Sequence, residues 1–138
     1  MSESLKELKV LYVEDEETIR EAMARMLNRV VGKLYVAKNG KEGLELYMDA
    51  GPDMVVSDIR MPVMDGIEMA KHIKEINFET PIIFTTAFGD SDYLKEVIDM
   101  GAQGYLIKPI EKKKLMQKLS FIADAVVNSR RKLSYLKL

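Results

Sequence analysis

The sequence predicts a doubly wound α/β domain, in which helices cover both faces of a five-stranded parallel sheet. Two observations support this prediction: five short apolar runs recur along the chain, and stretches with helical periodicity lie between them. A strand followed by a helix, repeated five times, is typical of parallel strands joined by helical crossovers. Because such crossovers are almost always right-handed, helices are expected on both faces, with the strands buried between them.

Each of the five apolar runs is too short for a helix, and several are rich in β-branched residues, as buried strands are. The predicted strands are Val10–Val13, Leu34–Ala37, Met54–Val56, Ile82–Phe84 and Tyr105–Ile107. No linker interrupts the pattern between residues 5 and 122. We therefore expect a single domain.

Four helical stretches separate the strands, and a fifth follows the last strand. Their apolar positions are Ile19, Met23, Met26, Leu27 and Val30 in the first, Met69, Ile73 and Ile76 in the third, and Leu94, Val97 and Ile98 in the fourth. This spacing places each set on one helical face. In the second stretch, Asn39 and Glu42 resemble an N-capping pair, and Gly51 ends the helix. The fourth closes near Gly101, and the fifth begins near Ile110.

The composition excludes several classes of protein. With 138 residues, 47% of them hydrophobic, the chain has enough apolar residues for a core but little room for a second domain. Its formal charge of −1 gives no reason to expect the broad basic surface of a nucleic-acid binder. The lack of cysteine excludes disulfides and thiolate metal sites. Neither a membrane-spanning run nor a secretory signal occurs, so we expect a soluble cytoplasmic protein.

The charge is divided between a body and a tail. Residues 111–138 contain eight basic and two acidic residues, a net charge of +6, so the rest of the chain carries −7. A seam of residues with heptad spacing runs along the last predicted helix: Leu115, Leu119, Ile122, Val126, Ser129, Leu133 and Leu136. We expect the domain to span 1–124 and the helix to cover the sheet through about Ile122.

Residues 125–138 would then extend the last helix beyond the domain. Val126, Leu133 and Leu136 would need a partner other than the sheet. Either two copies pair as a coiled coil and form a homodimer, or the helix leads into an output domain. A basic helix lying on a membrane surface is a weaker third option.

Chemistry is expected at one edge of the sheet, because ligands of open α/β sheets bind beside the carboxyl ends of the strands. Glu14 and Asp15 follow the first strand, and Asp58 follows the third. Three neighbouring carboxylates would repel by about 3 kcal/mol per pair unless a cation lay among them. Oxygen ligands without His or Cys favour Mg²⁺. Alternatively, Glu14 and Asp15 are only the acidic start of a helix.

Asp58 is the strongest single candidate, since it lies between a buried strand and a tight loop. A carboxylate beside a divalent ion is a competent nucleophile toward phosphorus and would give an aspartyl phosphate. Lys108 and the Thr86 hydroxyl would contact the other phosphoryl oxygens. Taken singly, Asp58 also fits a helix cap, although Asp65 is better placed for that. Thr86 likewise fits an ordinary strand-end hydroxyl, and Lys108 a surface lysine.

Four motifs together resemble the receiver domain of bacterial two-component response regulators, especially the chemotaxis receiver. They are Val10–Glu16, Asp58–Gly66, Thr86–Ala87 and Gly104–Pro109, and they occur in the family's order and spacing across about residues 7–124. The resemblance implies a flavodoxin-like strand order, 2-1-3-4-5. It also implies a Mg²⁺-dependent phosphoacceptor switch that catalyses only its own phosphorylation and dephosphorylation, and is not otherwise an enzyme.

The resemblance assigns roles around the metal. Asp58 would be the phosphoacceptor, Glu14 and Asp15 the acidic pair, and the backbone carbonyl of Arg60 a further ligand. Glu14 departs from the family, which more often has Asp there, and its longer arm would hold the ion through water. We expect Phe88 and the Arg60 stem to shield the phosphoryl group from water.

The remaining roles concern the switch. Thr86 and Tyr105 would be the switch pair, which alters the surface formed by the fourth helix, fifth strand and fifth helix. Lys108 would contact the phosphoryl group, and its bond to Pro109 would be cis. The lone His72 is expected at a solvated position. With no Walker loop present, the donor would be a sensor histidine kinase, a phosphotransfer protein or a small acyl phosphate.

Two alternatives stay open. One is a dimerising adaptor that works without phosphorylation. The other is a phosphatase resembling the haloacid dehalogenases, but that family wants a second Asp two residues after the nucleophile, where Arg60 stands. No DNA-reading helix-turn-helix follows residue 124, so we expect no direct nucleic-acid contact from this chain.

Overall fold

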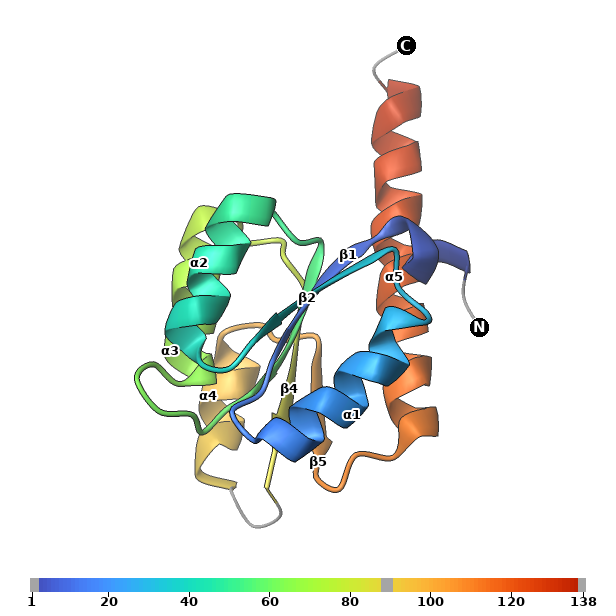
Figure 1. Ribbon diagram of the computed structural model, residues 1–138. Coiled ribbons are helices and arrows are strands. Elements are labelled where there is room, and N and C mark those ends of the chain that lie inside the picture. Colours follow the sequence, from blue (N-terminus) through green and yellow to red (C-terminus); the bar gives the residue numbers. More distant parts are fainter. Residues whose placement is uncertain (1–2, 88–90, 137–138) are drawn as a thin grey trace.

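A computed structural model describes residues 3–87 and 91–136 and arranges them in three layers (Figure 1). The strands are β1 (Lys9–Val13), β2 (Lys33–Ala37), β3 (Met54–Asp58), β4 (Ile82–Thr86) and β5 (Gly104–Ile107). They form one parallel sheet in the order β2-β1-β3-β4-β5. The predicted doubly wound, flavodoxin-like sheet is therefore confirmed.

Helices cover both faces of this sheet, as Figure 1 shows. One face carries α1 (Glu17–Asn28), α5 (Lys112–Leu136) and the short 3₁₀ helix η1 (Glu3–Glu7); the other carries α2 (Gly40–Ala50), α3 (Gly66–Ile76) and α4 (Leu94–Asp99), which the 3₁₀ helix η2 (Ser91–Tyr93) precedes. Successive residues of β1 alternate between two cores: Val10 and Tyr12 face α1 and α5, whereas Leu11 and Val13 face α2 and α3. Burial on both sides explains why the strands are continuous apolar runs.

The predicted helix boundaries have their expected capping contacts. The Asn39 side chain accepts a 2.8 Å hydrogen bond from the Glu42 N–H at the start of α2. Asp65 does the same for α3, accepting from the Glu68 N–H at 2.8 Å. Gly51 ends α2 with a left-handed φ of 60°. Asp65, and not Asp58, is thus the cap of the third helix.

The long helix α5 packs on the domain further than the sequence predicts. Val127 is buried and Val126 is half-buried, so the expectation that Val126 needs an outside partner is wrong. The cause is η1, whose Leu5 lies fully buried in the same core. A five-residue 3₁₀ helix has no helical apolar period, so the sequence pattern did not reveal this cover.

Beyond Val127, α5 projects from the body (Figure 1). An ion pair between Arg130 and Asp53 holds the beginning of this projecting segment against the residue that precedes β3. Asp53 also accepts a 2.8 Å hydrogen bond from the Lys9 N–H. Leu133 and Leu136 are 56% and 77% exposed. Across residues 3–87 and 91–136, no helix combines the length and apolar character needed to cross a membrane.

One residue in the loop between β3 and α3 has an unfavourable backbone conformation. Val63 has a φ of 72°, and the N–H of Met64 donates to the carbonyl of Pro62 at 2.9 Å, which closes a tight γ-turn. A β-branched residue rarely adopts positive φ, because its Cβ approaches the following carbonyl. The Val63 side chain is 76% exposed, so no packing compensates for this strain.

Replacing Val63 with Asn is expected to raise the free energy of unfolding by about 1 kcal/mol, since Asn tolerates positive φ far better. Urea denaturation monitored by circular dichroism measures the change. Val63→Ala serves as the control, because it keeps a Cβ without the stabilising amide, and it should stay within about 0.5 kcal/mol of the parent. An Asn variant less stable than the parent would contradict the assigned turn.

Candidate functional site

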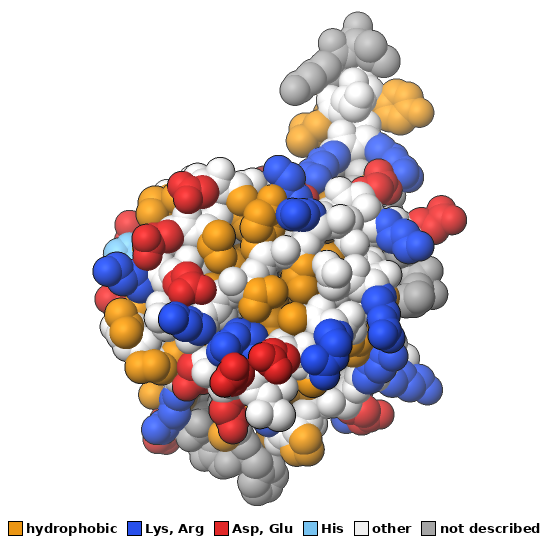
Figure 2. Space-filling view, viewed as in Figure 1, with side chains coloured by type: hydrophobic (Ala, Val, Ile, Leu, Met, Phe, Trp, Pro, Cys, Tyr) orange, Lys and Arg blue, Asp and Glu red, His pale blue; other side chains and the backbone are white. Residues whose placement is uncertain are grey.

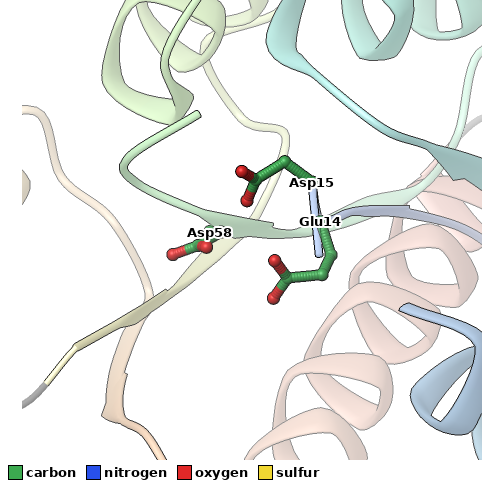
Figure 3. A group of neighbouring side chains, drawn as sticks. All are labelled: Glu14, Asp15 and Asp58. Atoms are coloured by element: carbon green, nitrogen blue, oxygen red, sulfur yellow. The ribbon is translucent and has the colours of Figure 1, made fainter. Parts of the chain in front are cut away.

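Residues far apart in sequence meet where β1, β3, β4 and β5 end. Asp58 and Thr86 are the last residues of β3 and β4, and Glu14 and Asp15 directly follow β1. Figure 3 shows the carboxylates of Glu14, Asp15 and Asp58 side by side at this edge. One oxygen of each lies within 4.8 Å of the others. The structure thus brings together the three acidic residues that the sequence singled out.

The three carboxylates differ in their exposure to solvent. Glu14 is 1% exposed and Asp58 is 7% exposed, whereas Asp15 lies at the exposed rim. The pKa of Asp15 is raised above its ordinary value. Partial burial is the largest cause, and the hydrogen bond to Glu14 and the negative charge of Glu14 add to it. The side chains therefore offer a cation an all-oxygen site with an open side at Asp15.

Lys108 connects two of these carboxylates. Its Nζ donates to Glu14 Oε1 at 2.7 Å and to Asp58 Oδ2 at 2.8 Å. Burial alone would lower the pKa of Lys108, but the hydrogen bonds to Asp58 and Glu14 and their charges outweigh it and raise the pKa. The predicted approach of Lys108 to Asp58 is present. Its contact with Glu14 was not predicted.

The Asp58 carboxylate is fixed on both sides. Oδ1 accepts a 2.9 Å hydrogen bond from the Ile59 N–H, while Oδ2 accepts from Lys108. Beneath it, Gly66 packs so closely that an added Cβ would lie 2.0 Å from the Asp58 carbonyl oxygen. The N–H of Gly66 also donates to the Ile59 carbonyl at 2.7 Å. Only glycine fits there, so the start of α3 positions the Asp58 backbone.

Arg20 of α1 supports the acidic pair, a role that no sequence pattern predicted. One of its guanidinium nitrogens donates to the backbone carbonyls of Glu14 and Asp15, each at 3.1 Å. Glu14 Oε2 in turn accepts from the Glu16 N–H at 3.1 Å. These bonds fix the turn after β1 without engaging the outward carboxylate of Asp15.

Thr86 and Tyr105 lie on the neighbouring strands β4 and β5. Thr86 is 1% exposed, and within the described part of the chain its Oγ1 is buried without any hydrogen bond. A buried hydroxyl without a partner is costly, so a missing acceptor is expected nearby. Tyr105 is half-buried against the core formed with α2, α3 and α4.

Arg60 lies in the loop that follows Asp58. Its guanidinium stands 5.3 Å from the centre of the Tyr93 ring, a cation–π contact that was not predicted. Both residues line a pocket beside the acidic cluster: Asp15, Arg60, Met61, Pro62, Asp65 and Tyr93. The proposed metal contact of the Arg60 carbonyl stays a prediction. Phe88 lies outside the described residues.

Comparison with known proteins identifies the class to which this fold and site belong. The family model described as the response regulator receiver domain matches residues 10–120. The chain therefore belongs to the receiver domains of two-component regulatory systems, which are signalling modules. The bond between Lys108 and Pro109 is cis, as the resemblance to this family implies.

Individual relatives agree with this assignment. The chain is 36% identical to chemotaxis protein CheY of Halobacterium salinarum over 116 residues, which cover 84% of the chain and 97% of that relative. It is 33% identical over 103 residues to sporulation initiation phosphotransferase F of Bacillus subtilis, covering 75% of the chain and 83% of that protein. The crystal structure of Vibrio cholerae chemotaxis protein CheY4 has 32% identity and a TM-score of 0.74, covering 80% of this chain and 94% of that one. Other relatives are longer regulators, of which this chain spans 22%, 32% and 50%.

Magnesium affinity is expected to depend on Asp15 and on pH. Asp15→Asn should weaken Mg²⁺ binding by at least about tenfold, since even the loss of an outer partner has effects of that size. Because the pKa of Asp15 is raised, protons compete with the ion at a higher pH than at an ordinary Asp, so affinity should fall on mild acidification. Isothermal titration calorimetry at several pH values measures both effects.

Asp49→Asn is the matched control, because Asp49 is an exposed carboxylate on α2, away from the acidic cluster. Its Mg²⁺ affinity should equal that of the parent. Equal affinities of the Asp15 and Asp49 variants would place the ion elsewhere.

Proposed function

We propose that the chain is a phosphoacceptor switch, in which a sensor histidine kinase or phosphotransfer protein phosphorylates Asp58 in a Mg²⁺-dependent reaction. The single observation that carries this proposal is the Asp58 carboxylate, flanked by the Lys108 ammonium at 2.8 Å and by the carboxylates of Glu14 and Asp15. Similarity to a chemotaxis protein and to a phosphotransferase supports it. Membership of the receiver-domain family supports a role for this reaction in two-component signalling.

The chemistry follows from the contacts of Asp58. One carboxylate oxygen forms a bond to phosphorus as the donor's P–N or P–O bond breaks, and the leaving group keeps the bonding electrons. Mg²⁺, bound by Glu14, Asp15, Asp58 and the Arg60 carbonyl, would offset the charge on the phosphoryl oxygens. Lys108 is already within hydrogen-bonding distance of Asp58 and would donate to another of these oxygens. No external substrate is turned over, so the chain catalyses only its own phosphorylation and dephosphorylation.

The switch would use the buried hydroxyl of Thr86. A phosphoryl oxygen on Asp58 gives Thr86 Oγ1 the acceptor that it lacks among the described residues. Moving the hydroxyl toward Asp58 leaves space for the half-buried ring of Tyr105, which changes the surface of α4, β5 and α5. Leu94, Ile98 and Ile107 on that surface are already exposed.

Phosphorylation of Asp58 by a histidine kinase also bears on where the chain works and on two alternative functions. A histidine kinase presents its phosphoryl group in the cytoplasm, which is where we place this chain. A haloacid-dehalogenase-like phosphatase is disfavoured, because Arg60 occupies the place of the second Asp. A phosphorylation-independent adaptor is the reading that a failed phosphorylation would favour.

Incubation with a small acyl phosphate and Mg²⁺ should add one phosphoryl group to Asp58. Intact mass spectrometry followed by peptide mapping locates the group, and addition of EDTA should prevent it. Asp58→Asn should take up none, and Lys108→Gln should slow uptake by about 100-fold, as expected for losing one donor to developing charge.

Thr86→Ala provides the control that separates chemistry from switching. It should accept the phosphoryl group but fail to move Tyr105, measured from the Tyr105 ring signals by NMR. Phosphorylation on another residue, or none that depends on Mg²⁺, would overturn the assignment.

The projecting part of α5 is proposed to pair with a second copy of the chain. Leu133 and Leu136 continue the apolar seam of α5 but are 56% and 77% exposed.

Sedimentation velocity at increasing concentration should show a dimer, and Leu133→Ser combined with Leu136→Ser should shift it to monomer. Tyr135→Ser is the control, since Tyr135 is 76% exposed but lies off the seam. A parent chain that stays monomeric would leave the output-domain interpretation.

A further inference from the structure

The contact between Arg60 and Tyr93 joins two functional parts of the molecule. Arg60 follows the phosphoacceptor Asp58 by two residues, and Tyr93 ends η2 directly before α4. The guanidinium lies 5.3 Å from the ring centre. Both side chains line the same pocket as Asp15, whose carboxylate belongs to the acidic cluster. The start of α4 is therefore connected to the loop that would sense a charge on Asp58.

The helix α4 is weakly packed, which makes this contact important. It has six residues, and Val97 is its buried side chain. Its first residue Leu94 is 40% exposed and Ile98 is 65% exposed. Tyr93 itself is half-buried against the core shared with α2 and α3. Short, exposed elements open locally at low free energy, so one contact at the N-cap residue Tyr93 shifts that equilibrium measurably.

We propose that Tyr93 is a positioning residue: it keeps the Arg60 guanidinium over its ring until a phosphoryl group on Asp58 draws the guanidinium away and releases the start of α4. This inference rests on the proposed phosphorylation of Asp58. An exposed cation–π contact is weak. A phosphoryl group instead offers a guanidinium parallel charge-assisted hydrogen bonds, which are stronger and more directional.

This route is separate from the one through Thr86. The Thr86 hydroxyl acts from the end of β4 on Tyr105 of β5, whereas Arg60 acts from the loop after β3 on the residue before α4. The two routes reach different ends of the same surface. A variant that blocks one should leave the other working, which separates them experimentally.

Amide hydrogen exchange of the segment Ser91–Asp99 tests the inference, with Asp58 phosphorylated by a small acyl phosphate and Mg²⁺ and its occupancy confirmed by mass. In the parent chain, phosphorylation should speed exchange by about two- to fivefold, the factor that corresponds to an exposed cation–π contact. Tyr93→Leu should show the faster exchange before phosphorylation and no further gain. Tyr93→Phe keeps the aromatic ring and should behave like the parent.

Three further variants sharpen the result. In Arg60→Gln, phosphorylation should no longer speed amide exchange of Ser91–Asp99, whereas in Thr86→Ala it should still do so. Lys71→Gln is the matched control, because Lys71 forms an exposed 3.4 Å ion pair with Glu96 of α4 but does not line the Asp15 pocket. It should keep the gain as well.

The outcomes are distinct. A chain that takes up no phosphoryl group on Asp58 overturns the proposed function and this inference together. A phosphorylated chain in which Tyr93→Phe and Tyr93→Leu exchange alike, or in which Thr86→Ala abolishes the gain, overturns the inference alone.

Discussion

The structure depends on one electrostatic constraint, the close approach of three carboxylates. At 4.8 Å and an effective dielectric constant near 20, each pair of charges repels by about 3 kcal/mol. The ammonium of Lys108 offsets part of this through its bonds to Glu14 and Asp58. Backbone N–H groups of Glu16 and Ile59 offset more. Three carboxylates and one ammonium still leave a net negative charge, and the open side at Asp15 makes this edge receptive to a hard cation.

The order of the strands makes this arrangement possible. Glu14 and Asp58 end up adjacent because β1 and β3 are paired neighbours. Lys108 follows β5, and β4 separates that strand from β3. Neighbouring strands are about 4.8 Å apart, so the Lys108 side chain must span roughly 10 Å from β5 to reach Asp58 at the end of β3. The Lys108 N–H is anchored to the Thr86 carbonyl at 2.7 Å, and the long lysine stem covers the rest.

The sequence predicted those features of the fold and the site that depend on local patterns of apolar and capping residues. Short apolar runs identified the five strands, and apolar periodicity together with capping residues identified the helices. The strand ends located the acidic cluster with Lys108. Single side-chain contacts have no such period. The bonds from Arg20 to backbone carbonyls five and six residues earlier, and the contact of Arg60 with Tyr93, could therefore be recognised only once the fold was known. The burial of Val127 depends on η1, which is too short to carry a pattern.

The continuity of α5 has a mechanical consequence. The helix runs unbroken for 25 residues, about 37 Å at 1.5 Å per residue. Its first half is embedded in the domain, and the ion pair of Arg130 with Asp53 braces it where it leaves. A stiff rod clamped at one end acts as a lever arm. A tilt of about 5° within the domain would displace Leu136, about 14 Å beyond Val127, by roughly 1 Å. The rigid helix would pass the same change of angle on to the exposed Leu133 and Leu136.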